Sequence, residues 1–301
     1  MKSPERVAFV GFGEAGQTIG RGLLAAEAAR VVAYDILFDA SRRSAPQQAA
    51  QALGVEMARD AAAAVREAGI VFLAVTASSS LEAAISCLPG LREGQLFLDI
   101  NSVSPQRKLE TAARVAPTGA SYVDVAVMAP VAPYAHEVPC LIGGPGAAAL
   151  LPRALAMGMK MELVSPEVGQ ASAIKMFRSI FIKGMEALMV ESMLAASEYR
   201  VEERVLASLR ETFPALDWEK LSGYMIERVV SHGKRRAAEM REVAETLEGI
   251  GIEPLMAAAA ARRQQWVADL GVKELLGGAK TEQRAELLRA IRTTMGRKET
   301  A

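Results

Sequence analysis

Three glycines in the segment VAFVGFGEAG, at Gly11, Gly13 and Gly16, have the spacing of a phosphate-binding turn. An apolar run of strand type enters the turn, and the amphipathic stretch GQTIGRGLLAAEAA leaves it. In this setting the first glycine allows a tight turn, the second lets the backbone approach a diphosphate, and the third lets helix and strand pack closely. The pattern predicts that the diphosphate of a dinucleotide rests on the helix N-terminus, although the turn alone identifies no reaction.

An acidic residue, Asp35, ends the next apolar run, VVAYD. A carboxylate at this point accepts hydrogen bonds from ribose hydroxyls and repels a 2′-phosphate, so we expect NAD as the cofactor. The neighbouring pair Arg42 and Arg43 leaves NADP open as the alternative. The residues expected to bind the cofactor are Gly11, Phe12, Gly13, Glu14, Ala15, Gly16, Asp35, Val75, Thr76, Asn101 and Ser102.

The composition predicts a soluble, cytoplasmic protein that acts on a small molecule. Lys and Arg together number 35, as do Asp and Glu, so no global field attracts nucleic acid or an anionic membrane. Only MKSPER precedes the first strand, which leaves no room for a signal peptide, and no apolar run approaches the ~20 residues of a membrane span. Cys87 and Cys140 lack metal or redox spacing and are expected to be buried free thiols; no metal is expected.

Two domains are expected, with a boundary at residues 165 and 166. Before it, short apolar runs alternate with Ala-rich helical stretches, which predicts an α/β domain with a doubly wound parallel sheet of the Rossmann type. After it, the strand pattern stops. The segment from Gly169 to Tyr199 has no proline and predicts one long interdomain helix, and further helical stretches follow to the C-terminus. The second domain, residues 166–301, is therefore expected to be helical.

Lys175, in the stretch VGQASAIKMFRS, has the properties of a proton acceptor for hydride chemistry. A nicotinamide cofactor carries the hydride, so the protein must supply a proton donor or acceptor and bind the substrate. In an apolar cleft beside a cationic nicotinamide the charged form of a lysine is disfavoured, and Ile174, Met176 and Phe177 are apolar neighbours. Periodicity alone leaves open that Lys175 is an ordinary solvated helix residue.

The segment from Gly169 to Ser179 resembles the motif G-x-G-x-x-x-K-x-x-x-N of the β-hydroxyacid dehydrogenases, the superfamily of 6-phosphogluconate and 3-hydroxyisobutyrate dehydrogenases. Ala171 stands at the second glycine and Ser179 at the asparagine, so the match is incomplete. The resemblance covers roughly residues 5–200 and indicates a divergent branch with an atypical helical C-terminal domain. It implies that Lys175 is the general acid and base and that Ser179 contacts the substrate.

A second segment, from Asp99 to Pro105, resembles the family motif D-x-x-T-x-x-P, which lies near the nicotinamide. Ser102 takes the place of the threonine. The resemblance implies that Ser102 contacts both the cofactor and the substrate.

The segment from Asp124 to Pro130 departs from the family motif D-A-P-V-S-G-G, which binds the substrate carboxylate in the relatives. Met128 and Pro130 cannot supply the same hydroxyl and backbone donors, because proline has no N–H group. Small acids such as 3-hydroxyisobutyrate are therefore not the expected substrates, and a bulkier or more apolar group is expected beside Val127, Met128 and Ala129. The alternative is that Met128 packs in the core.

A charged stretch from Ser231 to Arg241 is the candidate for the rest of the substrate site. At helical spacing His232, Arg235, Arg236 and Glu239 share a face that could bind an anionic or polyhydroxylated group. A solvated charged face explains the same spacing. In the family a lysine–aspartate pair on the corresponding helix lines the cleft, and only Glu239 falls near the position of that acid.

These features predict an NAD(P)-dependent oxidoreductase that transfers hydride between the cofactor and an alcohol or carbonyl, most plainly a hydroxy acid. An imine reductase is the enzymatic alternative, and a non-catalytic NAD-binding sensor is the other. The resemblance also implies a homodimer or a higher homo-oligomer, because relatives pack the long helix and the Ala-rich C-terminal helices against a second subunit.

Overall fold

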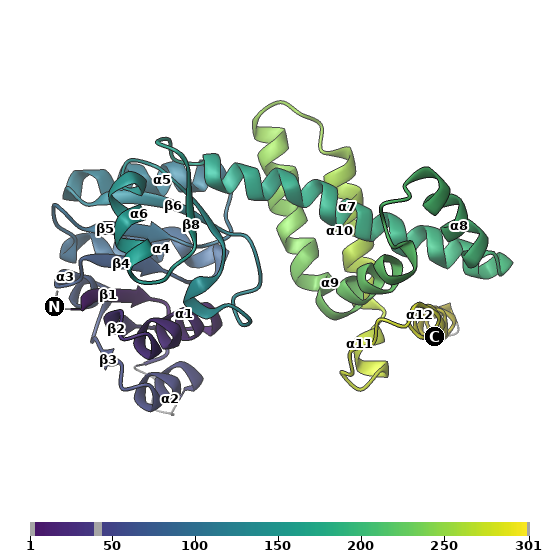
Figure 1. The fold of residues 1–301 in the computed structure, drawn as a ribbon, viewed down its shortest axis with the longest axis horizontal. Coiled ribbons are helices and arrows are strands. Elements are labelled where there is room, and N and C mark those ends of the chain that lie inside the picture. Colours follow the sequence, from purple (N-terminus) through teal and green to yellow (C-terminus); the bar gives the residue numbers. More distant parts are fainter. Residues whose placement is uncertain (1–3, 39–43, 300–301) are drawn as a thin grey trace. The chain divides into compact units, whose positions relative to one another are not determined.

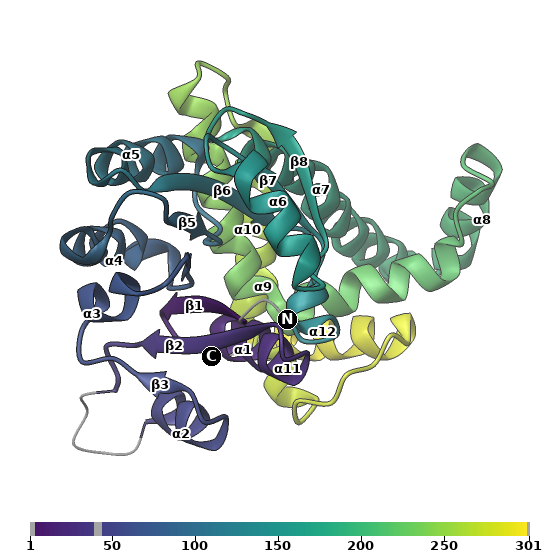
Figure 2. The same ribbon diagram turned by 60° about the vertical axis from the view of Figure 1, so that its left-hand side comes forward.

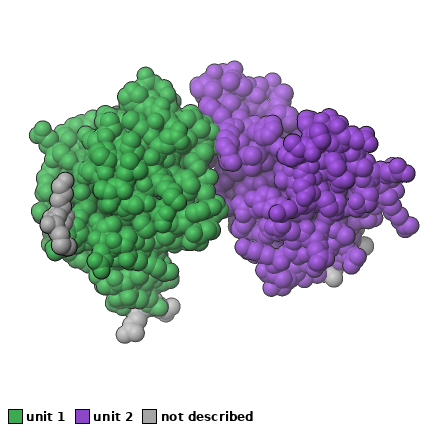
Figure 3. Space-filling model, in the orientation of Figure 1, with its two compact units in different colours: residues 1–175 green, residues 176–301 purple. Residues whose placement is uncertain are grey.

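The computed structural model describes residues 4–38 and 44–299, and the chain divides into two compact units. These are Met1–Lys175 and Met176–Ala301, coloured separately in Figure 3. Helix α7 begins in the first unit and continues into the second (Figure 1). Arg42 and Arg43, on which the NADP alternative depends, lie outside the described residues. The expected domain boundary at residues 165 and 166 stays a prediction.

The first unit is built on an eight-stranded sheet with the order β3-β2-β1-β4-β5-β6-β7-β8. Neighbouring strands are parallel except at the junction of β6 and β7, which is antiparallel. The strands are β1 (Glu5–Val10), β2 (Ala29–Tyr34), β3 (Glu56–Met57), β4 (Ile70–Leu73), β5 (Leu96–Asp99), β6 (Ser121–Val127), β7 (Cys140–Gly143) and β8 (Met161–Ser165).

Both faces of the central strands β1, β4 and β5 are largely buried, since successive side chains point to opposite sides and each side is covered by helices. Val7 and Phe9 of β1 belong to one core cluster and Ala8 and Val10 to another. Helices α1, α2 and α6 contribute to the first cluster, whereas α3, α4 and α5 contribute to the second and lie together on one side of the sheet in Figure 2. Strands buried on both faces are continuous apolar runs, which is why the sequence shows no alternation in them.

The helices of this unit begin at polar capping residues in several cases. Ser44, Asp60 and Ser104 each accept a hydrogen bond from a backbone N–H in the first turn of the helix that follows. The helices are α1 (Glu14–Ala25), α2 (Ala45–Ala52), α3 (Ala61–Arg66), α4 (Ser80–Cys87), α5 (Pro105–Val115) and α6 (Ala147–Ala156).

Helices are the only regular secondary structure among the described residues of the second unit. Its apolar residues form two clusters, in which α7 packs against α9 and α10 through residues such as Met176, Met240 and Ala257. The helices are α7 (Gln170–Tyr199), α8 (Glu202–Thr212), α9 (Trp218–Gly249), α10 (Leu255–Asp269), α11 (Val272–Leu275) and α12 (Arg284–Glu299).

The predicted fold class, an α/β domain of the Rossmann type followed by a helical domain, is confirmed. Two short elements, β3 and α11, were not predicted, and β7 enters the sheet antiparallel. Within residues 4–38 and 44–299, none of the helices is long and apolar enough to span a membrane.

Candidate functional site

The glycine turn lies between β1 and α1, as the sequence predicts, and each glycine has a distinct steric role. Gly11 has a φ of +91°, and a Cβ atom there would overlap the carbonyl oxygen of Ala74. A Cβ atom on Gly16 would lie 2.6 Å from the carbonyl oxygen of Gly11. A Cβ atom on Gly13 would meet no other atom within 4 Å. The turn is therefore packed tightly on the protein side and open at Gly13, the side on which a diphosphate would approach.

Asp35 ties this turn to the end of β2. Its Oδ2 accepts a 2.7 Å hydrogen bond from the backbone N–H of Phe12, and its Oδ1 accepts a 3.0 Å bond from the N–H of Leu37. A carboxylate has about four acceptor positions, so further capacity remains for ribose hydroxyls.

The other residues of the turn differ in what they can offer to a cofactor. The side chain of Phe12 is buried in the core and contacts the ring of Phe9 edge-on, so only its backbone faces the turn. Glu14 is exposed in the first turn of α1, and Ala15 packs against the core. Among the described residues, no side chain caps the N-terminus of α1. The N-terminus of α1, which has no side-chain cap, and the open space at Gly13 fit the diphosphate of a dinucleotide.

Two loops at the carboxyl ends of adjacent strands are held together by Asn101. Its side-chain oxygen accepts a 2.8 Å bond from the N–H of Val75, and its amide nitrogen donates to Asp99 at 2.7 Å. Thr76, the next residue, is exposed, and its hydroxyl lies 3.1 Å from that of Ser79. Ligands of open α/β sheets bind at this edge, which is where the sequence places the nicotinamide loops.

Lys175 meets Ser102 at this edge. The Nζ atom of Lys175, on α7, donates a 2.7 Å hydrogen bond to the Oγ of Ser102, which follows β5. Lys175 is half-buried and Ser102 is exposed. Ser179 lies one turn further along α7 and is also half-buried. The structure thus brings two of the predicted site residues into direct contact.

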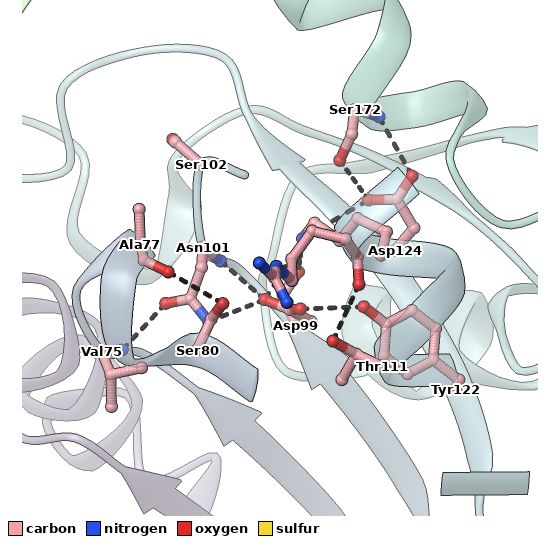
Figure 4. A network of polar contacts seen from close by, with 12 residues as sticks. Val75, Ala77, Ser80, Asp99, Asn101, Ser102, Thr111, Tyr122, Asp124 and Ser172 are labelled. Atoms are coloured by element: carbon pink, nitrogen blue, oxygen red, sulfur yellow. Dashed lines mark hydrogen bonds and ion pairs between the residues drawn. The ribbon is translucent and has the colours of Figure 1, made fainter. Parts of the chain in front are cut away.

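A buried polar network, which the sequence interpretation did not include, anchors the start of α7 (Figure 4). Asp124 of β6 accepts 3.0 Å bonds from the N–H groups of Gly169 and Ser172 and a 2.5 Å bond from the hydroxyl of Ser172. The fully buried Lys108 lies between Asp124 and Asp99. The one sequence signal was that Lys108 falls on the buried face of α5, with Thr111 and Val115 at helical spacing.

The segment Val127–Ala129 continues from β6 at the same edge. Val127 is the register partner of Cys140, and the N–H of Met128 donates a 2.8 Å bond to the carbonyl of Pro139. Val127, Met128 and Ala129 are all half-buried, so Met128 is not simply a core residue. The backbone donor of Met128 is already used within the protein.

Cys140 and Cys87 are free and buried, as predicted. Burial raises the pKa of the Cys140 thiol to about 12, and the nearby charge of Lys175 acts in the opposite direction.

The remaining predicted substrate residues lie on α9 in the second unit. Arg235 donates to Glu239 at 2.5 Å, and Glu239 also pairs with the buried Lys183 of α7 at 2.7 Å. The pKa of His232 is lowered by partial burial first and then by the charges of Arg228 and Arg235. Lys183 has a lowered pKa too, because burial outweighs its attraction to Glu239.

Arg236 does not share this face, contrary to the expectation from its spacing. Its guanidinium is buried and pairs with Glu186 of α7. The other three residues, His232, Arg235 and Glu239, still share a face of α9. The imidazole of His232 is partly exposed, the guanidinium of Arg235 is exposed, and Glu239 is the acidic residue of this face. In the part of the chain that the structure describes, no three His, Cys, Asp or Glu side chains are arranged to hold a metal ion.

The fold and the glycine turn define a nicotinamide-dinucleotide-binding domain of the dehydrogenase type. Residues 6–151 match the family described as the NAD binding domain of 6-phosphogluconate dehydrogenase, and residues 196–267 match a domain of unknown function, DUF1932. The chain therefore belongs to a branch of the β-hydroxyacid dehydrogenase superfamily that carries a DUF1932 helical domain.

Solved structures show the same two-part architecture. A conserved hypothetical protein from Sinorhizobium meliloti 1021 is 37% identical, with 97% of each chain covered and a TM-score of 0.82. A conserved protein of unknown function, similar in structure to 3-hydroxyacid dehydrogenases, is 28% identical over 88% of this chain and 97% of its own, with a TM-score of 0.75. A 3-hydroxyisobutyrate dehydrogenase from Mycobacterium tuberculosis shares the fold, with 17% identity, coverage of 96% and 99%, and a TM-score of 0.69.

Proposed function

We propose that this protein is an NAD(H)-dependent dehydrogenase that interconverts an alcohol and a carbonyl, with Lys175 as general acid and base. The observation that carries the proposal is the 2.7 Å contact between Lys175 and Ser102, beside the loops that hold Val75 and Asn101. A bound nicotinamide supplies the hydride acceptor or donor. Lys175 accepts the hydroxyl proton during oxidation and returns it during reduction, and Ser102 and Ser179 orient the hydroxyl group.

NAD is the proposed cofactor because Asp35 places a carboxylate at the end of β2, beside the glycine turn. A 2′-phosphate would bring a second negative charge to this carboxylate. NADP is the alternative cofactor, and the comparison of NAD⁺ with NADP⁺ described below distinguishes the two.

The substrate is proposed to carry an apolar or bulky group beside Met128. The N–H of Met128 is bonded to Pro139, and Pro130 has no N–H, so two backbone donors of this segment cannot bind a carboxylate. His232 and Arg235 of α9 are the proposed binding residues for an anionic group.

The proposed assembly is a homodimer or a higher homo-oligomer. Ile174, Phe177, Phe181 and Leu188 of α7 are exposed apolar residues at heptad-like spacing, so they form one stripe on the helix. A second copy of the chain would cover this stripe. Size-exclusion chromatography with light scattering tests the assembly, and a monomer at micromolar concentration would contradict it.

The direct test of the activity is a substrate panel with NAD⁺ and NADP⁺, comprising hydroxy acids, sugar acids and aromatic alcohols, and the corresponding carbonyls with the reduced cofactors. Oxidation of an alcohol with NAD⁺ is the expected result. Turnover confined to cyclic imines with NADPH would show an imine reductase instead. Tight cofactor binding without turnover on either panel would indicate a non-catalytic NAD-binding protein.

A further inference from the structure

Lys108 of α5 is completely buried and is surrounded by oxygen atoms. Its Nζ donates a 2.5 Å bond to the backbone carbonyl of Asp99 and lies 3.2 Å from Asp99 Oδ1 and 3.5 Å from Asp124 Oδ1. A fully buried lysine is rare and requires compensating partners, because its desolvation is costly. The two carboxylates supply that compensation.

The two aspartates would repel one another without this cation. Asp99 and Asp124 are register partners on the adjacent strands β5 and β6, so their side chains project from the same face of the sheet. Both are completely buried. Tyr122, also buried, donates to Asp99 at 2.8 Å, and its pKa is raised by burial and by the nearby charge of Asp99.

Asp99 connects this cluster to the cofactor loops. Its Oδ1 accepts bonds from the backbone N–H and the side-chain amide of Asn101, at 3.0 and 2.7 Å. Asn101 in turn holds the N–H of Val75. Ser102 is the next residue, so its place at the sheet edge follows from the position of Asp99.

Asp124 connects the same cluster to the catalytic helix. It accepts bonds from Gly169 and from the backbone and hydroxyl of Ser172, which are the groups at the start of α7 (Figure 4). Unpaired N–H groups at a helix start favour such a negative charge. Lys175 lies one turn beyond Ser172, so its position follows from that of Asp124.

We propose that Lys108 is a positioning residue for the Ser102–Lys175 pair. The ammonium group of Lys108 lies between the carboxylates of Asp99 and Asp124. Asp99 positions the loop that carries Ser102, and Asp124 positions the start of the helix that carries Lys175. The proposal rests on the proposed function only for the role of Lys175 as acid and base.

The charge of the cluster distinguishes this role from mere packing. Replacement of Lys108 by methionine keeps a long side chain but leaves two facing carboxylates beside the helix that carries Lys175. The additional negative charge stabilises the ammonium form of Lys175, so this residue should lose its proton at a higher pH than in the wild type. A residue that only filled space would change the stability and leave this midpoint unchanged.

The experiment compares wild type, Lys108→Met and Arg107→Met. Arg107 is the matched control, because it is the preceding residue of α5, is exposed and pairs with Glu110 on the same helix. Acetylation of Lys175 by acetic anhydride is followed by mass spectrometry as a function of pH, and the pH dependence of kcat is measured wherever a substrate is known. We expect the midpoint to rise in Lys108→Met and not in Arg107→Met. An unchanged midpoint in folded Lys108→Met overturns the proposal.

The double variant Lys108→Met with Asp124→Asn keeps the test decisive if the single variant fails to fold. It removes one of the two facing charges, so it should be more stable than Lys108→Met and should return the midpoint towards the wild-type value. A double variant that is no more stable than the single one contradicts the proposal. The labelling needs no substrate, so a shifted midpoint in a protein without dehydrogenase activity would refute the proposed function and leave the positioning role intact.

Discussion

The Nζ atom of Lys175 lies 2.7 Å from the Oγ of Ser102, although the two residues are 73 positions apart in the chain. Lys175 lies in the second turn of α7, and Ser102 lies in the loop that follows β5. A general base must be within hydrogen-bond reach of the proton it removes, and Lys175 is proposed to act on a substrate hydroxyl beside Ser102.

Replacement of Lys175 by alanine should therefore reduce turnover by about 10²- to 10⁴-fold and leave NADH binding nearly unchanged, because the side chain acts on the proton and not on the dinucleotide. Steady-state kinetics and NADH fluorescence titration measure the two effects. Lys160→Ala is the control, since Lys160 is exposed and pairs with Glu137. Wild-type turnover in Lys175→Ala would remove the residue from the mechanism.

The glycine turn allows cofactor binding to be separated from folding. Gly13 has an ordinary φ of −75° and open space where an alanine methyl group would lie, so Gly13→Ala should fold with little change in melting temperature and bind NADH at least about tenfold more weakly. Gly11→Ala should instead lower the melting temperature markedly, because its φ is positive and the new Cβ overlaps Ala74. Calorimetry and fluorescence titration check both variants. Equal NADH affinity in wild type and Gly13→Ala would argue against a diphosphate at this turn.

Sequence periodicity was sufficient for the architecture, because the strands are continuous apolar runs and the helices are long. It could not find β3, which has two residues, or α11, which has four. It also placed Arg236 on the substrate face, because spacing shows which residues share a face and not which edge of that face is buried.

Local motifs made the glycine turn and Lys175 predictable as candidate site residues, and their roles stay predictions. The buried cluster around Lys108 was not, because a single lysine in a helix of otherwise ordinary amphipathic character is indistinguishable from a solvated one. Its partners come from two strands and are recognised only once the register of β5 and β6 is known.

Asp35 provides a test of cofactor preference. Asp35→Asn keeps an acceptor for the N–H of Phe12 but removes the charge that would repel a 2′-phosphate, so the affinity for NADPH relative to NADH should rise about tenfold, or ~1.4 kcal/mol. Fluorescence titration with both cofactors measures the ratio. Asp60→Asn, at the exposed cap of α3, is the control. A ratio that stays at the wild-type value would show that Asp35 does not face the adenosine ribose.

Met128 and Pro130 provide a test of substrate class. The double variant Met128→Ser with Pro130→Gly restores a hydroxyl and a backbone donor, so kcat/KM for small 3-hydroxy acids should increase by about tenfold relative to that for bulkier alcohols. Kinetics on a matched pair of substrates gives the ratio. Unchanged kcat/KM for both classes, with unchanged stability, would mean that this segment does not contact the substrate.

His232 should titrate below its ordinary pKa of 6.5, because partial burial and the charges of Arg228 and Arg235 disfavour the imidazolium form. The unfolded chain then binds a proton at His232 more readily than the native protein does, so stability should decrease as the pH falls through 6.5 towards the native pKa. The chain has two histidines, so the His136→Gln variant assigns the NMR signals without ambiguity. Urea unfolding at several pH values should show a smaller acid-induced loss of stability in His232→Gln.

The NMR titration midpoint of His232 also tests the substrate class. An anionic substrate bound beside His232 and Arg235 should raise this midpoint, and a neutral one should not. A titration midpoint at or above 6.5 in the free protein would contradict the predicted lowering of the His232 pKa by burial and by the two arginines.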